Sequence, residues 1–551
     1  MKPPEFVTAT PAQLEELLAL AEASFPPPQY QLLKGVLDTF AYVMQALQNA
    51  KTSLRRFRHM LFGGSSEKRK KVFKDAPASA ADKHPPATAT DTATDTATDT
   101  PTAGDGESTS PPPPPPPGHG RHGAGAYCDS PVVELALPGL QSGDRCPACG
   151  DGRVYDSPPR IIVKVVGTPP LTATVYQVKR LRCRLCDAVF TAPLPEGLAE
   201  SKYDPGCATM IALLRYGTGM PFYRLESLQA SLNVPLSDAT QWDLVDAAIP
   251  GPRAARDELI RQAAQAPLLY HDDTPGKILD LMKARAKAEA AGEPVTVKAI
   301  NTSGIVADLQ GNKVVLFFTG HAHAGTNLAQ VLAHRAADLE TPIQMSDALA
   351  CNFVGDFKTL ISKCLSHGRR KVIDVSEHFP EPCRHVIEVL GRVYANDAHC
   401  RDEKLSPEDR LRHHQAHSAP PMQALQVWMN QQFEQRLVEP NGGLGQALRY
   451  LLNHWDGLTL FLRQTGAPLD NNICERALKR AIRHRKNSLF YKTLHGADVG
   501  DIYMSLIHTC ELCKVNAFAY LKALQTHAQA VMASPGQWLP WNYRGQLCAT
   551  A

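Results

Sequence analysis

The sequence lacks long apolar runs. No stretch of its 551 residues approaches the roughly 18 uninterrupted apolar residues that a membrane-spanning helix needs. The first residues include Glu5, Glu15 and Glu16, and they lack the basic-then-apolar layout of a signal peptide. Both absences argue against membrane insertion and secretion, so we expect the protein in the cytoplasm.

The chain also has little net charge and no crowded cysteine framework. Its formal net charge is +3 at neutral pH, so bulk electrostatics does not indicate a nucleic-acid partner. The 14 cysteines are scattered along the chain, which favours reduced thiols and a metal site over a disulfide framework. At roughly 100 to 200 residues per domain, the length predicts about three to five folded units.

The N-terminal region carries a local charge excess. Between Lys51 and Asp75 there are nine Lys or Arg against two acids, an excess of 9 − 2 = +7, as expected of a segment that binds nucleic acid. Upstream, apolar residues from Leu33 to Leu61 follow alternating steps of three and four, which is typical of a coiled coil. We expect self-association through this segment; a helix packed on its own protein is the alternative.

Residues 76–126 have too little apolar surface to form a core. They contain three copies of Thr-Ala-Thr-Asp (88–99) and seven consecutive prolines (111–117). This composition predicts a linker that is part flexible and part polyproline-stiff.

Two Cys-x-x-Cys pairs follow the linker, with strand-like runs between them. If the pairs meet across paired strands, they offer the four thiolates that structural zinc favours. Since protein ligands would fill all four positions, this Zn²⁺ would be structural and not catalytic. Unpaired cysteines and a redox dithiol are the alternatives. The four residues are Cys146, Cys149, Cys183 and Cys186.

A helical pattern runs from residue 204 to about residue 249. Segments 222–230 and 237–245 flank a short break, and Ser237 is a suitable N-cap for the second segment. This arrangement is typical of a helix-turn-helix. Two helices joined by a short turn also occur in helical domains that bind no DNA, so both interpretations stay open.

Two strand-like segments then present acids. Residues 267–275 carry Asp272 and Asp273, and residues 341–347 end in Asp347. Between them, 295–306 and 313–319 have the character of a β-hairpin. After the second acid, apolar periodicity predicts a helix from Phe353 to Cys364. Strands with acids at their ends, followed by a helix that bears a third acid, are expected of a ribonuclease H-like α/β sheet.

The third acid is Glu475, one turn inside a predicted helix start. Arg476, Arg480 and Arg483 follow it at i, i+4 and i+7, so they share one helix face. A carboxylate beside a basic ridge indicates a metal that works next to a phosphate backbone.

The chemistry of phosphodiesters gives a reason for three acids. Two Mg²⁺ about 4 Å apart can activate a water or a terminal hydroxyl and relieve the charge on the leaving oxygen, and hard cations take oxygen ligands. Each acid also has a simpler interpretation. Asp272 and Asp273 would only terminate a strand, Asp347 would cap the following helix, and Glu475 would close a capping box with Asn472. The basic residues near these acids in the sequence favour the catalytic interpretation.

Several motifs carry a resemblance to a known family. They are Tyr270-His-Asp-Asp-Thr-Pro275, Gln344-Met-Ser-Asp-Ala-Leu-Ala-Cys-Asn352, Ser366-His-Gly-Arg-Arg370 and Pro468-Leu-Asp-Asn-Asn-Ile-Cys-Glu-Arg-Ala-Leu-Lys479. Together they resemble the insertion-sequence-66 family of bacterial DDE transposases. The likeness also covers residues 61–68, 118–122, 485–490 and 504–509 and both cysteine pairs, which is nearly the whole chain outside the linker. One departure is Gly64, where family members commonly have arginine.

The resemblance implies that Asp272, Asp347 and Glu475 bind two Mg²⁺ (or Mn²⁺), nick the ends of the element and direct the freed hydroxyl onto target DNA. Asp273 is then a neighbour and not a ligand. His367, Arg369 and Arg370 match a family motif, with a solvent-facing helix end as the alternative. The full set of expected DNA contacts is His367, Arg369, Arg370, Arg476, Arg480, Arg483, Arg485 and Lys486.

We therefore expect a multidomain α+β protein. The gap between the second and third acids, 475 − 347 = 128 residues, is long for a bare ribonuclease H-like sheet and indicates a helical insertion. The expected parts are an N-terminal helical, coiled-coil and basic segment (1–75), the linker (76–126), a β-rich zinc module (127–200), a helical DNA-binding region (201–262), a ribonuclease H-like catalytic core (263–395 and 467–530) interrupted by the insertion (396–466), and a tail (531–551).

The expected partners are double-stranded DNA of the element ends and target, further copies of the chain, and small companion proteins from the same element. Two rival functions remain. One is a zinc-containing DNA-binding regulator with an inactive core, and the other is a metal-dependent nuclease without strand transfer.

Overall fold

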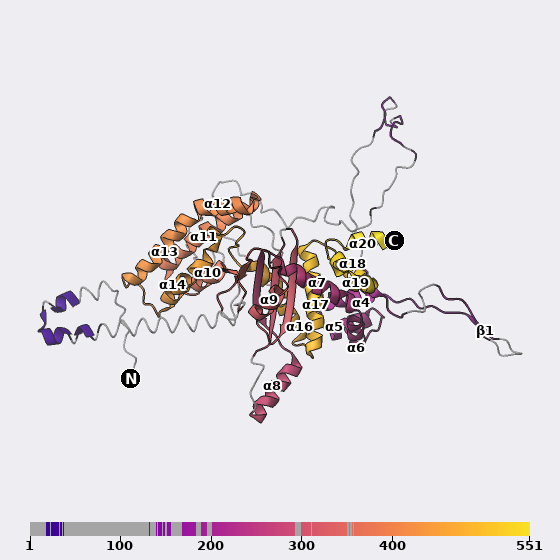
Figure 1. Ribbon diagram of the computed structural model, residues 1–551, viewed down its shortest axis with the longest axis horizontal. Coiled ribbons are helices and arrows are strands. Elements are labelled where there is room, and N and C mark those ends of the chain that lie inside the picture. The colour runs from indigo at the N-terminus through magenta and orange to yellow at the C-terminus, as the bar shows by residue number, and fades with distance from the viewer. Residues whose placement is uncertain are drawn as a thin grey trace, which may run out of the picture. The chain divides into compact units, whose positions relative to one another are not determined.

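The computed structural model describes residues 201–292, 299–309, 311–349 and 357–550, residues 352 and 355, and short pieces of the chain before residue 196 (Figure 1). The chain divides into two compact units, residues 1–84, 196–228 and 236–551, and residues 85–195 and 229–235. The predicted basic segment, the linker and the four zinc-site cysteines lie outside the described residues, as does the predicted coiled coil beyond residue 37.

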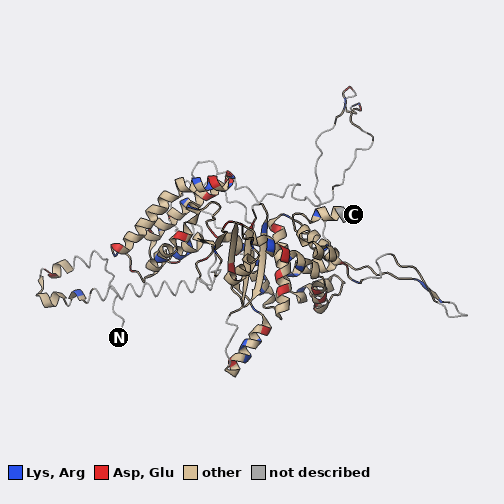
Figure 2. Ribbon diagram, viewed as in Figure 1, with Lys and Arg blue, Asp and Glu red and all other residues tan. Residues whose placement is uncertain are grey.

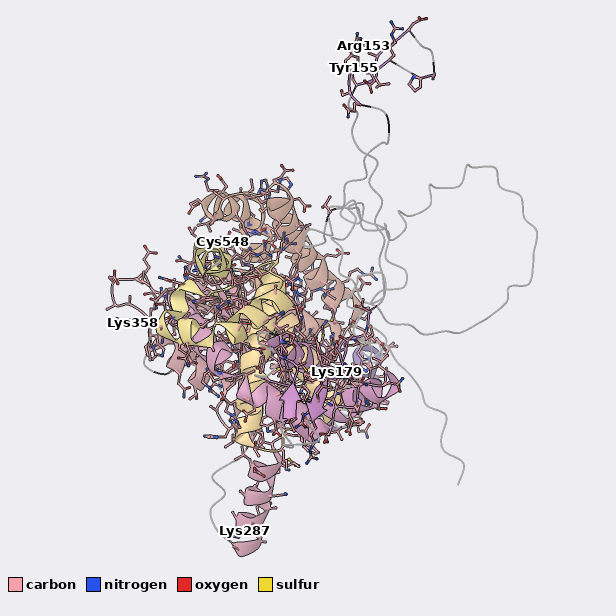
Figure 3. All side chains as sticks on the ribbon, turned by 90° about the vertical axis from the view of Figure 1, so that its right-hand side faces the viewer. Arg153, Tyr155, Lys179, Lys287, Lys358 and Cys548 are labelled. Atoms are coloured by element: carbon pink, nitrogen blue, oxygen red, sulfur yellow. The ribbon has the colours of Figure 1, made fainter. Side chains whose placement is uncertain are left out.

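The smaller unit has β structure among its described residues. Strands β1 (Arg180–Arg182) and β2 (Val189–Thr191) pair in antiparallel register. Arg145 forms a second antiparallel bridge with Arg153, and the Arg153 side chain, labelled in Figure 3, donates a hydrogen bond to the carbonyl of Gly143 (3.0 Å).

The larger unit is built on a five-stranded mixed sheet in the order β5-β4-β3-β6-β7. Strand β4 runs antiparallel to β3 and β5, whereas β6 and β7 run parallel to β3. The strands are β3 (Leu268–Pro275), β4 (Asn301–Asp308), β5 (Lys313–Gly320), β6 (Ile343–Ser346) and β7 (Leu360–Lys363). The expected hairpin is confirmed as β4 and β5.

One secondary-structure prediction is wrong. Residues 360–363 of the segment expected to be a helix from Phe353 to Cys364 form strand β7, which pairs with β6. The apolar spacing of a run this short does not separate a helix from a buried strand. The helix begins only at Leu365, as α10 (Leu365–Ile373).

Helices cover both faces of the sheet. Helix α16 (Asn472–Ser488) packs across β3 and β4, and α9 (Ala324–Leu332) packs on the other face of the same two strands. Helix α7 (Pro250–Ala264) packs against α9, β4 and β5. Because both faces are covered, β4 is buried along almost its whole length.

The N-terminal part of the larger unit is helical, as predicted. It comprises α4 (Pro205–Ala212), a π-helical turn (Leu213–Gly217), α5 (Phe222–Ser231) and α6 (Asp238–Ala247). The predicted cap is confirmed, since Ser237 accepts a hydrogen bond from the backbone N–H of Thr240. Whether α5 and α6 read DNA stays a prediction.

Helix α8 (Leu279–Ala291) follows β3 and has no buried side chain. Figure 2 shows residues of both charge signs along it, and Lys287 is labelled on it in Figure 3. No helix within the described ranges combines the length and the apolar character needed to cross a bilayer.

A second group of helices occupies residues 380–458. It contains α11 (Pro380–Asp402), α12 (Pro407–His417), α13 (Ala419–Glu434), α14 (Gly443–Asn453) and α15 (Trp455–Leu458). After α16 come α17 (Leu494–Leu512), α18 (Ala517–Thr526), α19 (Ala528–Ala533) and α20 (Tyr543–Thr550). Trp538, before α20, is buried and stacks on His527.

Helix α17 covers the open edge of β5 with polar side chains. Asp501, Ser505 and Thr509 recur every four residues and accept hydrogen bonds from the backbone N–H groups of Thr319, Phe317 and Val315, respectively. Alternate residues of an edge strand leave their N–H groups unpaired, which invites pairing with another chain. The helix satisfies these donors, so β5 is closed to further strands.

Asp501 gives this contact a pH dependence. Burial raises the pKa of its carboxyl to about 7, although the bonds from Thr319 act in the opposite direction. An acid whose pKa is raised in the folded state contributes stability below its unfolded pKa of about 4 and loses that contribution as the pH rises through its folded pKa. Between pH 4 and 7 the Asp501 contribution therefore falls.

We predict that Asp501→Asn makes stability less dependent on pH. An amide keeps an acceptor for the Thr319 N–H and never ionises. The free energy of unfolding of the variant, relative to that of wild type, should therefore rise by a few kcal/mol between pH 5 and pH 8, at about 1.4 kcal/mol per pKa unit. Thermal unfolding followed by circular dichroism at several pH values measures the effect. Asp280→Asn, on exposed α8, is the control, and identical pH profiles for Asp501→Asn and wild type would refute the prediction.

Candidate functional site

Asp272 and Asp273 are neighbours in β3 and point to opposite faces of the sheet. Asp273 accepts hydrogen bonds from Ser303 Oγ (2.6 Å) and from the backbone N–H of Ala324 (3.0 Å), at the start of α9. Asp272 lies opposite Gly304 of β4, on the face that α16 covers. The simpler interpretation, in which the two acids terminate a strand, is wrong because β3 continues through Pro275.

Gly304 lets α16 approach the sheet closely. A Cβ atom at this position would lie 2.9 Å from Leu478 Cδ2 and 3.5 Å from Cys474 Sγ. The Cys474 thiol donates to the carbonyl of Gly304 (3.3 Å). Cys474 directly precedes Glu475, so this contact fixes the first turn of α16 over the strand pair that carries Asp272. A glycine inside a strand signals such an approach, and sequence reasoning did not use that signal.

The chain that enters α16 is tied to the sheet at several points. The Asn471 side chain donates to the carbonyl of His271 (2.9 Å), and the Asn471 N–H donates to Cys364 Sγ (3.2 Å). The Leu365 N–H, at the start of α10, donates to the carbonyl of Leu469 (3.0 Å). These bonds join the start of α16 to β3, to the residue after β7 and to α10.

Glu475 does not close a capping box. Asn472 instead donates to the carboxylate of Asp470 through its backbone N–H (3.2 Å) and its side-chain amide (2.7 Å). Among the described residues, Glu475 Oε1 is buried and has no hydrogen-bond partner. A buried carboxylate oxygen without a hydrogen bond is energetically costly, and a bound ion is one of the explanations for such an atom.

Asp347 follows β6 and comes level with Asp272. The parallel register of β3 and β6 pairs Tyr270 with Met345, an offset of 345 − 270 = 75 residues. The separation of the two acids, 347 − 272, is the same 75 residues, so continuing the register brings Asp347 opposite Asp272. Asp347 itself lies one residue beyond β6, and its negative charge contributes to the raised pKa of Asp272.

One oxygen of Asp347 shapes the turn after β6. Its Oδ1 accepts hydrogen bonds from the backbone N–H of Leu349 (3.0 Å) and from the Asn352 side chain. Asp347 therefore has a local structural role that resembles the predicted helix cap. Both bonds go to the same oxygen, and neither involves Oδ2.

Asp347 and Glu475 lie close enough to Asp272 to affect its ionisation. The pKa of Asp272 is raised to about 7, first by burial and further by the negative charges of Asp347 and Glu475. Burial also raises the pKa of Cys474 well above its usual range, and Asp272 and Glu475 add to the shift. The acids converge from β3, from the end of β6 and from the first turn of α16. A bound cation would favour the ionised form of Asp272.

His367 of α10 faces Glu475. Its Nδ1 lies 3.7 Å from Glu475 Oε1, and ligand atoms of Cys364, His367 and Glu475 lie within 4.8 Å of one another, the one such group of three found in the part of the chain that the structure describes. Burial raises the pKa of the Cys364 thiol to about 11, so Cys364 stays neutral. The carboxylates of Asp272 and Asp347 lie outside this tighter group.

The exposed basic residues of α16 differ from the predicted set. Arg480 is turned inward, donates to the carbonyl of Gly217 (3.0 Å) and pairs with Glu511. Arg485 donates to the carbonyl of Pro275 at the end of β3. The exposed basic residues of α16 form a ridge with spacings of three, four and three residues. This ridge contains Lys479, which the sequence analysis did not include. It consists of Arg476, Lys479, Arg483 and Lys486.

The remaining predicted DNA contacts lie on α10. Arg369 is half-buried and Arg370 is exposed, both within one turn of His367. Lys358, an exposed residue before β7, is labelled in Figure 3.

Comparison with known proteins identifies the family. The family model described as "Transposase IS66 family" matches residues 200–499, a span that contains all three acids. The chain belongs to the IS66 family of transposases. The expected family is thereby confirmed.

Proteins from Sinorhizobium fredii (strain NBRC 101917 / NGR234) are similar to this transposase. Uncharacterized protein y4jD is 26% identical over 391 residues, which cover 66% of this chain and 71% of that protein. Uncharacterized protein y4hP is 23% identical over 426 residues, 74% of each chain. Uncharacterized protein y4qI is 26% identical over 400 residues, 65% of this chain and 66% of that protein. The names of these three proteins state no activity.

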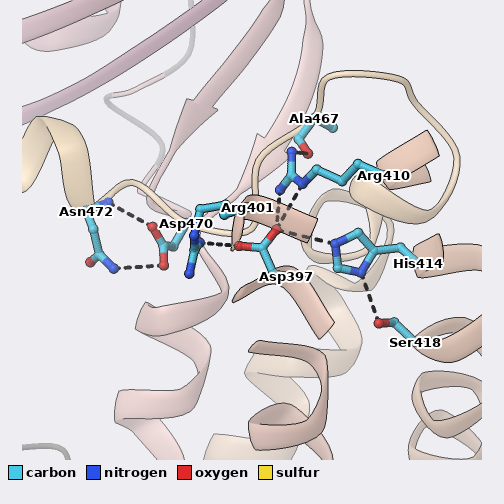
Figure 4. Close-up of polar contacts among 8 residues, drawn as sticks. All are labelled: Asp397, Arg401, Arg410, His414, Ser418, Ala467, Asp470 and Asn472. Carbon is cyan, nitrogen blue, oxygen red and sulfur yellow. Dashed lines mark hydrogen bonds and ion pairs between the residues drawn. The ribbon is translucent and has the colours of Figure 1, made fainter. Parts of the chain in front are cut away.

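A buried charge cluster of this transposase leads from α11 and α12 toward the acids (Figure 4). Asp397 of α11 accepts two hydrogen bonds from Arg410 of α12, from Nε (2.9 Å) and Nη2 (2.7 Å), and also pairs with Arg401. Arg410 Nη1 donates to the carbonyl of Ala467 (3.3 Å), five residues before α16 begins. The cluster thus connects the helical region to the chain that carries Glu475.

Burial and charge oppose each other at Asp397. Burial by itself raises the pKa of this carboxyl, but the hydrogen bond from His414 and the charge and bonds of Arg410 outweigh it and lower the pKa to about 2. The carboxylate is therefore ionised at neutral pH, and its stability depends on its partners. The contribution of the cluster is present above the unfolded pKa of about 4 and is lost as the pH falls through about 2.

We predict that Arg410 and Arg401 differ in their contribution to stability. The Arg410 side chain is 23% exposed and that of Arg401 is 65% exposed. Arg410→Ala leaves the buried Asp397 carboxylate with too few partners and should lower the free energy of unfolding by about 3 kcal/mol, whereas Arg401→Ala should cost about 1 kcal/mol or less. Denaturant unfolding of the full chain compares them, and equal losses would contradict the assignment.

Proposed function

We propose that this protein is a DDE transposase that cleaves DNA at the ends of its insertion sequence and joins the freed ends to target DNA. The proposed catalytic acids are Asp272, Asp347 and Glu475. The observation that carries the proposal is that Asp347 and Glu475, up to about 200 residues away in the sequence, both contribute to the raised pKa of Asp272. Membership of the transposase family supports the same assignment.

We further propose that the sheet is of the ribonuclease H-like type. The order β5-β4-β3-β6-β7, with β4 antiparallel and β6 and β7 parallel to β3, supports this assignment. The acids are distributed as that fold requires, one on central β3, one after the adjacent β6, and one on a helix that packs over the sheet.

The residues at the site fit divalent cations. Bound Mg²⁺ or Mn²⁺ ions would make the attacking hydroxyl nucleophilic and stabilise the leaving oxygen. Glu475 Oε1 is a buried acceptor without a partner among the described residues, and the hydrogen bonds that Asp272 and Asp347 accept from described residues go only to Oδ1 in each case. The three carboxylates lie too far apart to surround a single ion. Such an arrangement suits two ions about 4 Å apart.

The exposed ridge of α16 supports DNA binding beside the acids. Arg476, the first residue of the ridge, directly follows Glu475, and Lys486 lies ten residues further on, about 15 Å along the helix. Basic side chains at this spacing can bind successive phosphates, and replacing any one of them by alanine should reduce the salt dependence of binding by about one unit of slope. Arg480 and Arg485 act in packing, as their internal partners indicate.

We also propose a structural Zn²⁺ at Cys146, Cys149, Cys183 and Cys186. The paired strands β1 and β2 between and beside these cysteines support a small β-rich module, which such a site would stabilise. Homo-oligomers and small companion proteins from the same element are proposed as further partners.

The deciding experiment supplies DNA that bears the ends of the element, together with Mg²⁺. Asp272→Asn, Asp347→Asn and Glu475→Gln should each lower cleavage and joining by at least about two orders of magnitude, because each removes a negative metal ligand. DNA binding measured in the same salt should change little. Asp280→Asn, an exposed acid on α8, is the matched control and should retain activity.

Other outcomes select the rival functions. Cleaved DNA without any joined product would identify a metal-dependent nuclease. Binding of the element ends without cleavage, by wild type and variants alike, would identify a DNA-binding regulator and refute the transposase mechanism.

A further inference from the structure

His367 and Glu475 present two buried atoms to each other without a hydrogen bond. Among the described residues, neither His367 Nδ1 nor Glu475 Oε1 has a hydrogen-bond partner. The side chains are 23% and 27% exposed, yet these two atoms are enclosed. Two polar atoms that are both buried and both without a partner indicate a site for a ligand that satisfies them together.

The distance between the two atoms limits what that ligand can be. At 3.7 Å the atoms are too far apart for a direct hydrogen bond, whose upper limit is about 3.2 Å. Two atoms that each lie about 2.1 Å from one metal ion can be up to about 4.2 Å apart. The observed separation therefore fits two ligands of one ion.

The fold holds His367 in this position from both sides. Two residues before it, the Leu365 N–H donates to the carbonyl of Leu469. On its other side, Gly368 lies so close to α14 that a Cβ atom there would come within 2.6 Å of Leu451 Cδ2. The backbone on both sides of His367 is thus held in place, which helps to pre-organise its side chain for binding.

Cys364 completes the cluster in space but has other partners. Its Sγ lies 3.0 Å from Ser366 Oγ and accepts the Asn471 N–H at 3.2 Å. These contacts connect α10 to the start of α16, so we assign Cys364 to positioning. The ligands left for an ion are an imidazole nitrogen and a carboxylate oxygen.

We propose that His367 Nδ1 is a direct ligand of the divalent ion that Glu475 holds, which makes this half of the site a mixed imidazole and carboxylate centre. The proposal rests on the proposed function in one respect, the role of Glu475 as a metal ligand. Imidazole nitrogen binds first-row transition ions well, whereas Mg²⁺ favours oxygen. A half-site with one imidazole and one carboxylate therefore takes a transition ion, of which Mn²⁺ is the one that carboxylates also suit.

Pulsed electron paramagnetic resonance of Mn²⁺ bound to the full chain tests the proposal without any DNA reaction. Directly coordinated imidazole gives a ¹⁴N modulation of the Mn²⁺ signal. Wild type should show this modulation, and His367→Ala and Glu475→Gln should lose it. His367→Ala should also weaken Mn²⁺ binding by at least about tenfold. His334→Ala, an exposed histidine after α9, should match wild type.

The outcomes separate this proposal from the proposed function. Glu475-dependent Mn²⁺ binding without ¹⁴N modulation would overturn the role of His367 and leave the acidic site intact; an ion pair between His367 and Glu475 would then explain their contact. The absence of any Glu475-dependent Mn²⁺ binding would overturn both. If His367→Ala does not fold, the comparison of wild type with Glu475→Gln and His367→Asn still decides the question.

Discussion

Helix α16 approaches β4 so closely that glycine is required at position 304, and this contact sets the geometry of the site. Leu478 and Cys474 pack on the bare backbone there, which places Glu475 beside the strand that carries Asp272. Placing Asp272 here opposes folding, because burial raises its pKa and repulsion by Asp347 and Glu475 adds to the shift. The buried apolar contacts of α16 and the hydrogen bonds of Asn471 offset that repulsion, so the site is held by packing that lies next to it and not by the acids themselves.

Side chains alternate between the two faces of a strand, so the adjacent acids Asp272 and Asp273 lie on opposite faces of the sheet although they look equivalent in the sequence. Asp273 faces α9, where Ser303 and the first turn of the helix use its carboxylate. Asp272 lies on the face that α16 covers, and its Oδ1 accepts a hydrogen bond from the Asp273 N–H. The choice of Asp272 over Asp273 came from family resemblance, because a sequence does not say which face of a strand a helix will cover. The structure supplies the missing step through the pairing of Asp272 with Gly304.

Other parts of the site were accessible from the sequence to different degrees. The hairpin and the helix that bears Glu475 can be predicted from local sequence patterns, because periodic apolar spacing is clear in segments of this length. Strand β7 was missed because a four-residue strand has too short a pattern to exclude a helix. Arg480 was placed on the DNA-binding face because spacing alone ignores neighbours; its partner Glu511 lies 31 residues away in the sequence. The exposed ridge instead uses Lys479.

The helical region between the second and third acids acts on the site from a distance. Asp397 and Arg410 form a buried pair that would be expensive to expose, and Arg410 extends it to the carbonyl of Ala467. From there the chain runs directly to Asp470, which binds both amides of Asn472 at the start of α16. The contacts therefore connect α12 with the segment that leads into α16. This connection depends on one side chain that reaches across 57 residues of sequence, so no local pattern reveals it. It links the helices that follow the last strand to the helix that carries Glu475.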